Sequence, residues 1–164
     1  MRDQYPYSRV TLDNEIGTRR GAVALDGSPA VFYIRPSPIG SSRWMLFFEG
    51  GGWCLSAGDC IGRSATGWGS GRMHMAKLPE SAFQSPIGWA LQGGTAMGAA
   101  LADFNIVVMR YCDGASFSGE AHIGTSGSVR LAPRRLAAGG APWILRRLRQ
   151  RSMLQELLLA VATA

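Results

Sequence analysis

Several features that define common classes of protein are missing from this chain of 164 residues. No hydrophobic run approaches the roughly 20 residues that a helix needs to cross a bilayer. The N-terminus, MRDQYPYSRV, is polar and has no apolar core of the kind that defines a signal peptide. We therefore expect neither a membrane span nor a signal peptide within this chain.

Cysteine is scarce, with three residues in the whole sequence. In a secreted protein an odd number leaves one cysteine without a partner inside the chain. The spacing of Cys54 and Cys60 fits a small disulfide-closed loop, a pair of free thiols in a cytosolic protein, or half of a zinc site with His74. Because no second cysteine pair and no HxxxH pattern supports zinc, we expect no metal and no other cofactor.

Acidic residues are nearly absent from the C-terminal part of the chain. Residues 121–164 contain seven arginines and one glutamate, whereas residues 1–120 contain ten basic and ten acidic residues. The net charge of +6 therefore lies entirely in the tail. A basic tail can bind phosphates, but no aromatic platform or nucleic-acid motif accompanies this one. We therefore do not expect a nucleic acid as partner.

The central feature of the sequence is a short apolar run that ends in three glycines. Trp44–Phe48 is too short for a typical helix and rich in aromatic residues, so we expect a buried strand. Glu49 and the triplet Gly50–Gly52 follow it. Such a triplet lets a ligand approach backbone N–H groups closely, and a strand entering it builds half of an oxyanion hole in α/β hydrolases. A tight turn between two core elements explains the glycines equally well.

The other apolar segments predict further strands of an α/β fold. Ala22–Leu25, a DGSP turn and Ala30–Ile34 have the pattern of an N-terminal β-hairpin. Asn105–Tyr111 is apolar and β-branched, which favours a central strand, and it runs directly into the loop Cys112–Gly119. Because ligands bind beyond the carboxyl ends of the strands in open α/β sheets, we expect this loop and the glycine triplet on the same rim.

The last part of the chain has a different character. Residues 121–141 are small, polar or Arg and show no sustained period. Apolar residues then recur at helical spacing, which predicts a helix over residues 142–161. We therefore divide the chain into an N-terminal part, residues 1–120, and a divergent Arg/Ala/Gly-rich tail, residues 121–164.

Three pieces of the sequence together resemble the pectin acetylesterase family, which includes the Notum-type carboxylesterases. They are DGSPAVFYIRP followed by SSRWMLFFEGGGWC, the spacing of Cys54 and Cys60, and NIVVMRYCDGASFSGE. The resemblance covers roughly residues 8–120 and is nearest to the plant-like branch. It implies a secreted serine carboxylesterase that deacetylates pectin or another acetylated cell-wall polysaccharide. We expect such a protein to be monomeric, with a disulfide between Cys54 and Cys60 and a partner for Cys112 outside this chain.

The mechanism of that family combines a serine nucleophile, a histidine base and an aspartate that orients the histidine. Carried over to this sequence, the resemblance implies that the backbone of Gly52 and Trp53 stabilises the oxyanion, with Gly51 needed for close approach. Trp53 either forms a wall of the acyl pocket or packs in the core. Asp113 and Ser116 either line the same cleft or belong to a turn held by the Asp113 side chain.

The catalytic half of the family pattern is missing from the chain. The family carries its nucleophile in a G-x-S-x-G elbow after the next strand, followed by the aspartate and the histidine. No G-x-S-x-G occurs here, and the nearest imitation, Gly124–Ser128, lacks the last glycine and a preceding strand. We therefore identify no catalytic residue. We expect a truncated or frame-shifted product that is inactive alone, with an incomplete sheet that exposes an apolar edge.

Two further functions stay open. The chain is a non-catalytic polysaccharide-binding remnant if it keeps the substrate rim without the chemistry. It is a small basic nucleic-acid-binding protein if the Arg-rich tail acts on its own. Ester turnover, binding of pectin without turnover, and salt-sensitive binding of nucleic acid distinguish the three functions.

Overall fold

The computed structural model describes residues 6–12, 22–83 and 95–117, together with the backbone of three short strands at residues 121–123, 129–131 and 156–161. The elements, in chain order, are β1 (Tyr7–Thr11), β2 (Val31–Arg35), β3 (Arg43–Phe48), α1 (Ala57–Ser64), the 3-10 turn η2 (Gly71–Met73), β4 (Lys77–Leu78), the 3-10 turn η3 (Glu80–Ala82), α3 (Ala96–Ala100), β5 (Asn105–Met109), β6 (Ala121–Ile123), β7 (Val129–Leu131) and β8 (Glu156–Val161).

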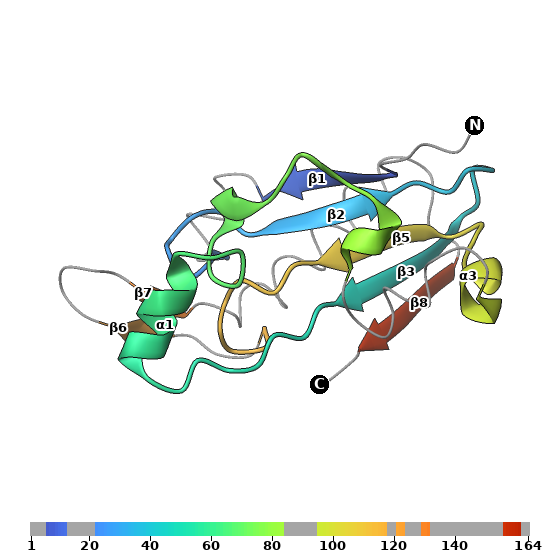
Figure 1. Cartoon of the computed structure of the whole chain (residues 1–164). Helices are drawn as coiled ribbons and strands as arrows, with labels where there is room; N and C mark the ends of the chain where they lie inside the picture. Colours follow the sequence, from blue (N-terminus) through green and yellow to red (C-terminus); the bar gives the residue numbers. More distant parts are fainter. Residues whose placement is uncertain are drawn as a thin grey trace.

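The described strands form one mixed sheet in the order β4-β1-β2-β5-β3-β8, and β6 and β7 form a separate antiparallel pair (Figure 1). β5 lies inside the large sheet, antiparallel to β2 on one side and parallel to β3 on the other. Few helices accompany this sheet. The arrangement is consistent with the predicted incomplete α/β fold, and the central position expected for Asn105–Tyr111 is confirmed for its strand portion, β5.

The N-terminal antiparallel pair is present, but its first strand differs from the predicted one. β2 pairs with β1, from Ser8 opposite Ile34 to Thr11 opposite Val31. The segment Ala22–Leu25 makes only an isolated bridge, between Val23 and Pro29. The DGSP turn closes that bridge, with Gly27 at a φ of +77°. The hairpin pattern identified the turn correctly and assigned the wrong partner, because pairing along the five residues of β1 satisfies more backbone groups of β2 than the segment Ala22–Leu25 does.

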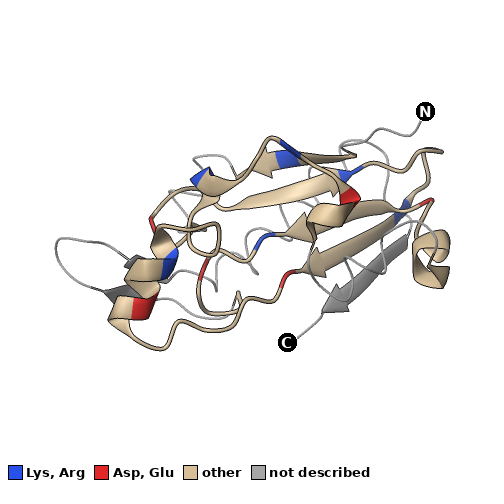
Figure 2. Cartoon of the chain, in the orientation of Figure 1, with Lys and Arg blue, Asp and Glu red and all other residues tan. Residues whose placement is uncertain are grey.

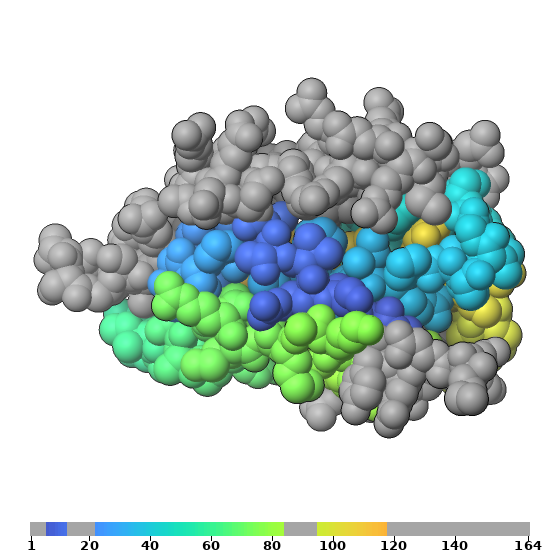
Figure 3. Space-filling view, turned by 90° about the horizontal axis from the view of Figure 1, so that it is seen from above, coloured from blue at the N-terminus to red at the C-terminus, as the bar shows by residue number. Residues whose placement is uncertain are grey.

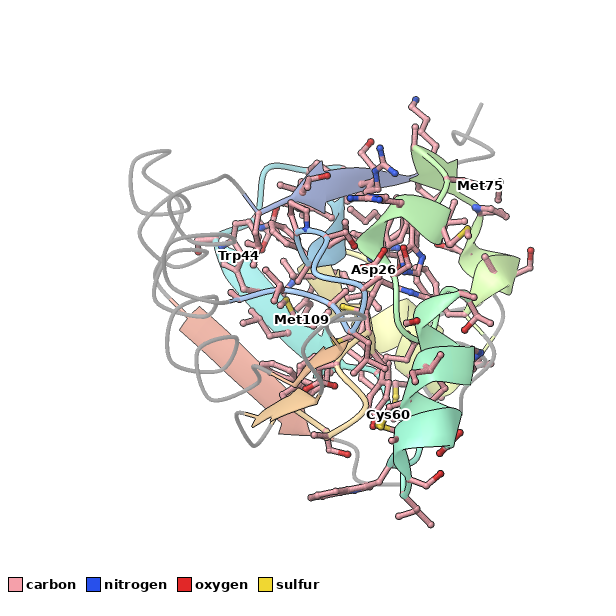
Figure 4. The ribbon with its side chains drawn as sticks, turned by 90° about the vertical axis from the view of Figure 1, so that its left-hand side faces the viewer. Asp26, Trp44, Cys60, Met75 and Met109 are labelled. Carbon is pink, nitrogen blue, oxygen red and sulfur yellow. A yellow bond between two sulfur atoms is a disulfide. The ribbon has the colours of Figure 1, made fainter. Side chains whose placement is uncertain are left out.

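Both faces of the sheet are buried, which explains the continuous apolar run in β3. Trp44 and Leu46 point into one core cluster, and Met45 and Phe47 point into the other. Successive side chains of a strand point to opposite faces, so a strand covered on both sides needs apolar residues at every position. In Figure 4, Trp44 and Met109 lie in the interior, and both belong to the first cluster.

The C-terminal helix predicted over residues 142–161 is wrong for its last six residues. Glu156–Val161 form β8, which runs parallel to β3 from Arg43 opposite Glu156 to Phe48 opposite Val161. The apolar run ELLLAV fits a helix or a strand. It forms a strand because the backbone groups at the edge of β3 need hydrogen-bond partners. The sheet was expected to expose an apolar edge, and at β3 that edge is covered by β8. The rest of the predicted helix, residues 142–155, lies outside the described residues.

The described surface mixes the two signs of charge. Figure 2 shows Lys and Arg positions interspersed with Asp and Glu along the described ribbon, without a segment of one sign. In the view of Figure 3 the blue N-terminal strands lie beside the green segment, in keeping with the pairing of β1 and β4. Among the residues that the structure describes, no helix has the length and apolar character needed to cross a bilayer.

Candidate functional site

Two loops meet at the carboxyl ends of β3 and β5. We call residues 49–54 the glycine loop and residues 111–117 the Asp113 turn. Because β3 and β5 are parallel neighbours, both loops leave the sheet at the same edge. They are also hydrogen-bonded to one another: the Cys54 N–H donates to the Gly114 carbonyl at 2.9 Å, and the Tyr111 hydroxyl donates to the Gly52 carbonyl. The sequence therefore placed both loops on the correct rim.

Glycine is required at two positions of the glycine loop. A Cβ on Gly51 would lie 2.4 Å from Cδ1 of Tyr111 and 2.8 Å from Cε3 of Trp68, closer than any side chain tolerates. Gly52 has a φ of +65°, in the left-handed region that disfavours residues with a Cβ. The structure gives Gly51 a packing role against the rings of Tyr111 and Trp68, and the close approach of a ligand to Gly51 stays a prediction.

The glycine loop leaves some of its backbone donors unused. The loop is anchored at its ends by the N–H groups of Glu49, which donates to the Met109 carbonyl at 3.1 Å, and of Cys54. Between these anchors, the N–H groups of Gly52 and Trp53 have no hydrogen-bond acceptor in the described part of the chain. Both residues are exposed. Exposed and unpaired amides at a glycine are what an anion-binding loop needs.

Trp53 does not pack in the core. Its side chain is 56% exposed, so the alternative of core packing is wrong for this residue. A second tryptophan, Trp68, is 47% exposed and contacts the Tyr111 ring at 6.3 Å between ring centroids. Two half-exposed tryptophan side chains, Trp53 and Trp68, thus lie in or beside the glycine loop, whereas the sequence analysis identified only Trp53.

A buried ion pair joins the two strand ends. Glu49 follows β3 and Arg110 follows β5, and an Nη1 of Arg110 lies 2.8 Å from Oε1 of Glu49. The other carboxylate oxygen of Glu49 accepts the Tyr111 N–H at 3.2 Å. Burial raises the pKa of Glu49, and the charge of Arg110 opposes that shift. Sequence reasoning missed this pair, because it placed Arg110 inside the predicted strand Asn105–Tyr111, whereas β5 ends at Met109.

Helix α1 is attached to the glycine loop by a disulfide. Cys54 and Cys60 are bonded, which confirms the disulfide alternative for this pair. Ser56 caps the helix by accepting the Asp59 N–H at 3.2 Å. Figure 4 shows Cys60 on the inner side of the helix, and its residue is 2% exposed. Within the described residues, no group of side chains suited to a metal ion occurs, so the zinc alternative has no support there.

A cleft of about 360 Å³ lies between α1 and the glycine loop. Gly51 and Gly62 contribute backbone to its wall, Asp59 and Arg63 contribute charges of opposite sign, and Trp68 contributes an aromatic surface. Thr66 completes the lining. An aromatic ring beside paired polar groups is a common arrangement for ligands that have both apolar and hydroxylated surfaces.

The Asp113 turn holds itself together. The Asp113 carboxylate accepts the N–H groups of Ala115 at 3.3 Å and Phe117 at 2.6 Å, and the residue is fully buried. These bonds stabilise Ser116 and Phe117 with φ of +50° and +59°. Burial raises the pKa of Asp113, and the bonds from backbone N–H groups oppose the shift. Asp113 thus has the turn-forming role that the sequence left open, whereas Ser116 is exposed.

Two further titratable residues, His74 and Cys112, are buried. Burial and the charge of Arg110 lower the pKa of His74 to about 4, so the imidazole is neutral near pH 7. This agrees with a packed histidine. Cys112 is a free thiol with no exposed surface, and burial raises its pKa to about 12.

Comparison with known proteins gives the family. The sequence model of the pectinacetylesterase family matches residues 6–132. The chain belongs to the pectinacetylesterase family. Pectin acetylesterase 5 of Arabidopsis thaliana is 35% identical over 119 residues, which are 72% of this chain and 26% of that protein. Pectin acetylesterase 11 of the same plant is 36% identical over 107 residues, which are 65% of this chain and 26% of that protein.

The family resemblance extends to a second group of enzymes. The palmitoleoyl-protein carboxylesterase NOTUM of Homo sapiens is 30% identical over 127 residues, which are 70% of this chain and 23% of that protein. The chain thus spans about a quarter of the length of the curated relatives that it matches. These relatives confirm the resemblance drawn from EGGGWC and RYCDGASFSG, and they are carboxylesterases by name.

Proposed function

We propose that this member of the pectinacetylesterase family carries the oxyanion-stabilising loop of a carboxylic ester hydrolase whose substrate is acetylated pectin or a related polysaccharide. The observation that supports this proposal is that the N–H groups of Gly52 and Trp53, on the loop that follows β3, have no acceptor among the described residues. In ester hydrolysis such donors bind the negative oxygen of the tetrahedral intermediate, and each is worth about 2.7–4 kcal/mol.

The remaining parts of a Ser-His-Asp mechanism have no candidate in the described residues. The serine hydroxyls of Ser28, Ser64 and Ser70 donate to Asp26 or to a backbone carbonyl, and none is hydrogen-bonded to a histidine in the part of the chain that is described. The sequence contains no G-x-S-x-G elbow. We therefore propose that the chain does not turn over an ester by itself.

A second candidate function has its own observation. The half-exposed Trp68 lines a cleft that also presents Asp59, Arg63 and Thr66, and the exposed Trp53 belongs to the glycine loop, whose Gly51 forms part of the cleft wall. Stacking on an aromatic face together with polar contacts is a general way to hold a sugar ring. We propose that the chain binds an acetylated polysaccharide without cleaving it. Direct contacts from Ser116, and from Asp113 through the turn that it holds, stay predictions.

The proposed setting is extracellular, and the chain is proposed to be monomeric. The disulfide between Cys54 and Cys60 supports an oxidising compartment, because such bonds are rare in the reducing cytosol. Sedimentation of the purified chain at several concentrations measures its oligomeric state, and a mass that rises with concentration contradicts the monomer.

One set of measurements tests both functions. The purified chain is incubated with p-nitrophenyl acetate and with acetylated pectin, and released p-nitrophenol and acetate are measured. We expect no turnover. Turnover that a serine-directed phosphonate abolishes would show that the chain contains a nucleophile. Calorimetric titration with acetylated pectin and with deacetylated polygalacturonate then measures binding. We expect the acetylated polymer to bind and the Trp53→Ala variant to bind it more weakly; equal binding by both proteins contradicts a role for Trp53.

A further inference from the structure

The direction of the Gly52 and Trp53 N–H groups is set by the carbonyls on the other side of the same peptide bonds. Every described peptide bond is trans. In a trans peptide the C=O of one residue and the N–H of the next point in opposite directions. The Gly51 carbonyl therefore shares its plane with the Gly52 N–H, and the Gly52 carbonyl shares its plane with the Trp53 N–H. Any group that holds these two carbonyls also aims these two N–H groups.

The carbonyls of Gly51 and Gly52 both accept hydrogen bonds from side chains outside the glycine loop. Nη1 of Arg63, on α1, donates to the Gly51 carbonyl at 2.7 Å and to the Gly52 carbonyl at 3.1 Å. The Tyr111 hydroxyl, beyond β5, also donates to the Gly52 carbonyl. The two carbonyls thus face the helix and the neighbouring loop. The N–H groups of Gly52 and Trp53 consequently face away from both.

Arg63 is itself fixed in place. Its Nε donates to Oδ1 of Asp59 at 3.3 Å, one turn earlier on α1, and the other oxygen of Asp59 accepts the Leu55 N–H at 3.1 Å. The disulfide from Cys60 to Cys54 ties the same helix back to the glycine loop. A guanidinium whose Nε is already bound to Asp59 loses less freedom when its Nη1 binds the carbonyls.

Tyr111 is fixed by packing. The residue is 1% exposed, and its ring contacts Trp68 on one side and Phe117, at 5.9 Å between centroids, on the other. Its hydroxyl oxygen also accepts the Ser116 N–H at 3.3 Å. A hydroxyl that accepts one hydrogen bond and donates another is polarised, and it polarises the peptide group that accepts from it. The Trp53 N–H, on that same peptide, becomes a stronger donor.

We infer that Arg63 and Tyr111 are positioning residues that aim the Gly52 and Trp53 N–H groups at the oxyanion. This inference rests on the proposed function, because it assigns those N–H groups to an anionic oxygen. The positive charge of Arg63 adds a second effect: placed on the carbonyl side, it draws electron density toward the carbonyl oxygens and strengthens the opposite N–H donors. Sequence patterns give no signal for either role, since neither residue is part of the glycine motif.

Amide NMR of the full chain tests the inference without requiring turnover. Methylphosphonate is the probe, because it presents a tetrahedral anionic oxygen, and chloride at equal ionic strength is the control ion. The variants are Tyr111→Phe, which removes only the hydroxyl, and Arg63→Lys, which keeps the charge but loses the planar fork. Ser64→Ala is the matched control on α1, because the Ser64 hydroxyl donates to the Ile61 carbonyl and does not contact the loop.

In the wild type we expect methylphosphonate to shift the Gly52 and Trp53 amide signals more than other amides, and chloride to leave them in place. Each positioning variant should keep the thermal midpoint of the wild type within a few degrees. Its apparent affinity for methylphosphonate should be weaker by about tenfold, which corresponds to a loss of about 1.4 kcal/mol of binding free energy. Ser64→Ala should match the wild type.

The outcomes separate the two proposals. If the wild-type amides do not respond to methylphosphonate, the proposed oxyanion loop is contradicted, and the positioning role falls with it. If the wild type responds and both Tyr111→Phe and Arg63→Lys respond with the same affinity, only the positioning role is overturned. Loss of the amide response to methylphosphonate in Tyr111→Phe, together with an unchanged response in Ser64→Ala, supports the inference. Tyr111→Phe changes no charge and removes only the hydroxyl that contacts the glycine loop.

Discussion

The glycine loop and the Asp113 turn lie on one rim of the sheet, yet their backbones are satisfied in different ways. The Asp113 turn uses its own carboxylate to bind the N–H groups of Ala115 and Phe117. The glycine loop has no such internal acceptor, and Arg63 and Tyr111 hold its carbonyls from outside. The Asp113 turn thus spends two of its own N–H groups on holding its shape. The glycine loop is held by side chains from outside, so its N–H donors stay available to a ligand. A functional role is therefore expected for the glycine loop.

The largest expected effect comes from removing the internal acceptor of the Asp113 turn. Asp113→Ala removes the carboxylate that accepts the N–H groups of Phe117 and Ala115, and a buried donor that loses its acceptor costs about 1–3 kcal/mol. It also removes the contacts that stabilise Ser116 and Phe117 at positive φ. We expect a loss of about 3–4 kcal/mol in the free energy of unfolding, measured by urea denaturation. Asp113→Asn keeps one acceptor oxygen and should lose clearly less; equal losses in both variants contradict the role of the acceptor.

A smaller effect is expected from filling the space beside the glycine loop. Gly51→Ala drives a methyl group into the rings of Tyr111 and Trp68, so we expect a loss of about 2–3 kcal/mol in the free energy of unfolding. Gly62→Ala is the matched control, because it lies in α1 with open space around it and should stabilise the chain by about 0.5–1 kcal/mol. Thermal or urea denaturation of the two variants measures both effects, and equal changes would refute the close contact at Gly51.

The smallest effect concerns a titratable group that belongs to neither loop. The pKa of His74 is lowered from its ordinary 6.5 to about 4 by burial. Between these two values the unfolded chain binds more protons than the folded chain, so stability falls as the pH falls. From pH 7 to pH 5.5 this contribution is about 1 kcal/mol.

The His74→Gln variant isolates that contribution. Glu49 and Asp113 have pKa values raised by burial, which gives a slope of the opposite sign in both proteins. Urea denaturation at a series of pH values should therefore show a difference between wild type and variant that shrinks as the pH falls from 7 to 5.5. A constant difference would mean that His74 is not buried as a neutral imidazole.

The sequence predicted those parts of the fold that depend on local pattern. The strands β3 and β5 were identified from continuous apolar runs, and their glycine-rich ends were placed on one rim because parallel neighbours share a direction. Pairing across long separations was not predictable in this way. β8 lies against β3 although its sequence also fits a helix, and β2 prefers β1 to the nearby Ala22–Leu25. In both cases the available sheet edge, and not local propensity, decides the structure.

The candidate site likewise has one part that the sequence predicts and another part that it does not. Gly51, Gly52 and the Cys54–Cys60 disulfide follow from a motif that is contiguous in the sequence. Arg63 and Tyr111 reach the loop from a separate helix and from the neighbouring strand end. Their roles arise only when folding brings three segments together, so no spacing rule within one segment reveals them.

The buried thiol of Cys112 limits which disulfides the folded chain can exchange. Three cysteines permit three different single pairings. Exchange requires a thiolate with access to a sulfur of the existing bond. Cys112 has no exposed surface and a pKa of about 12, so almost none of it is ionised at neutral pH. Its burial in the folded chain thus protects the Cys54–Cys60 bond against internal reshuffling, and so preserves the brace between α1 and the glycine loop.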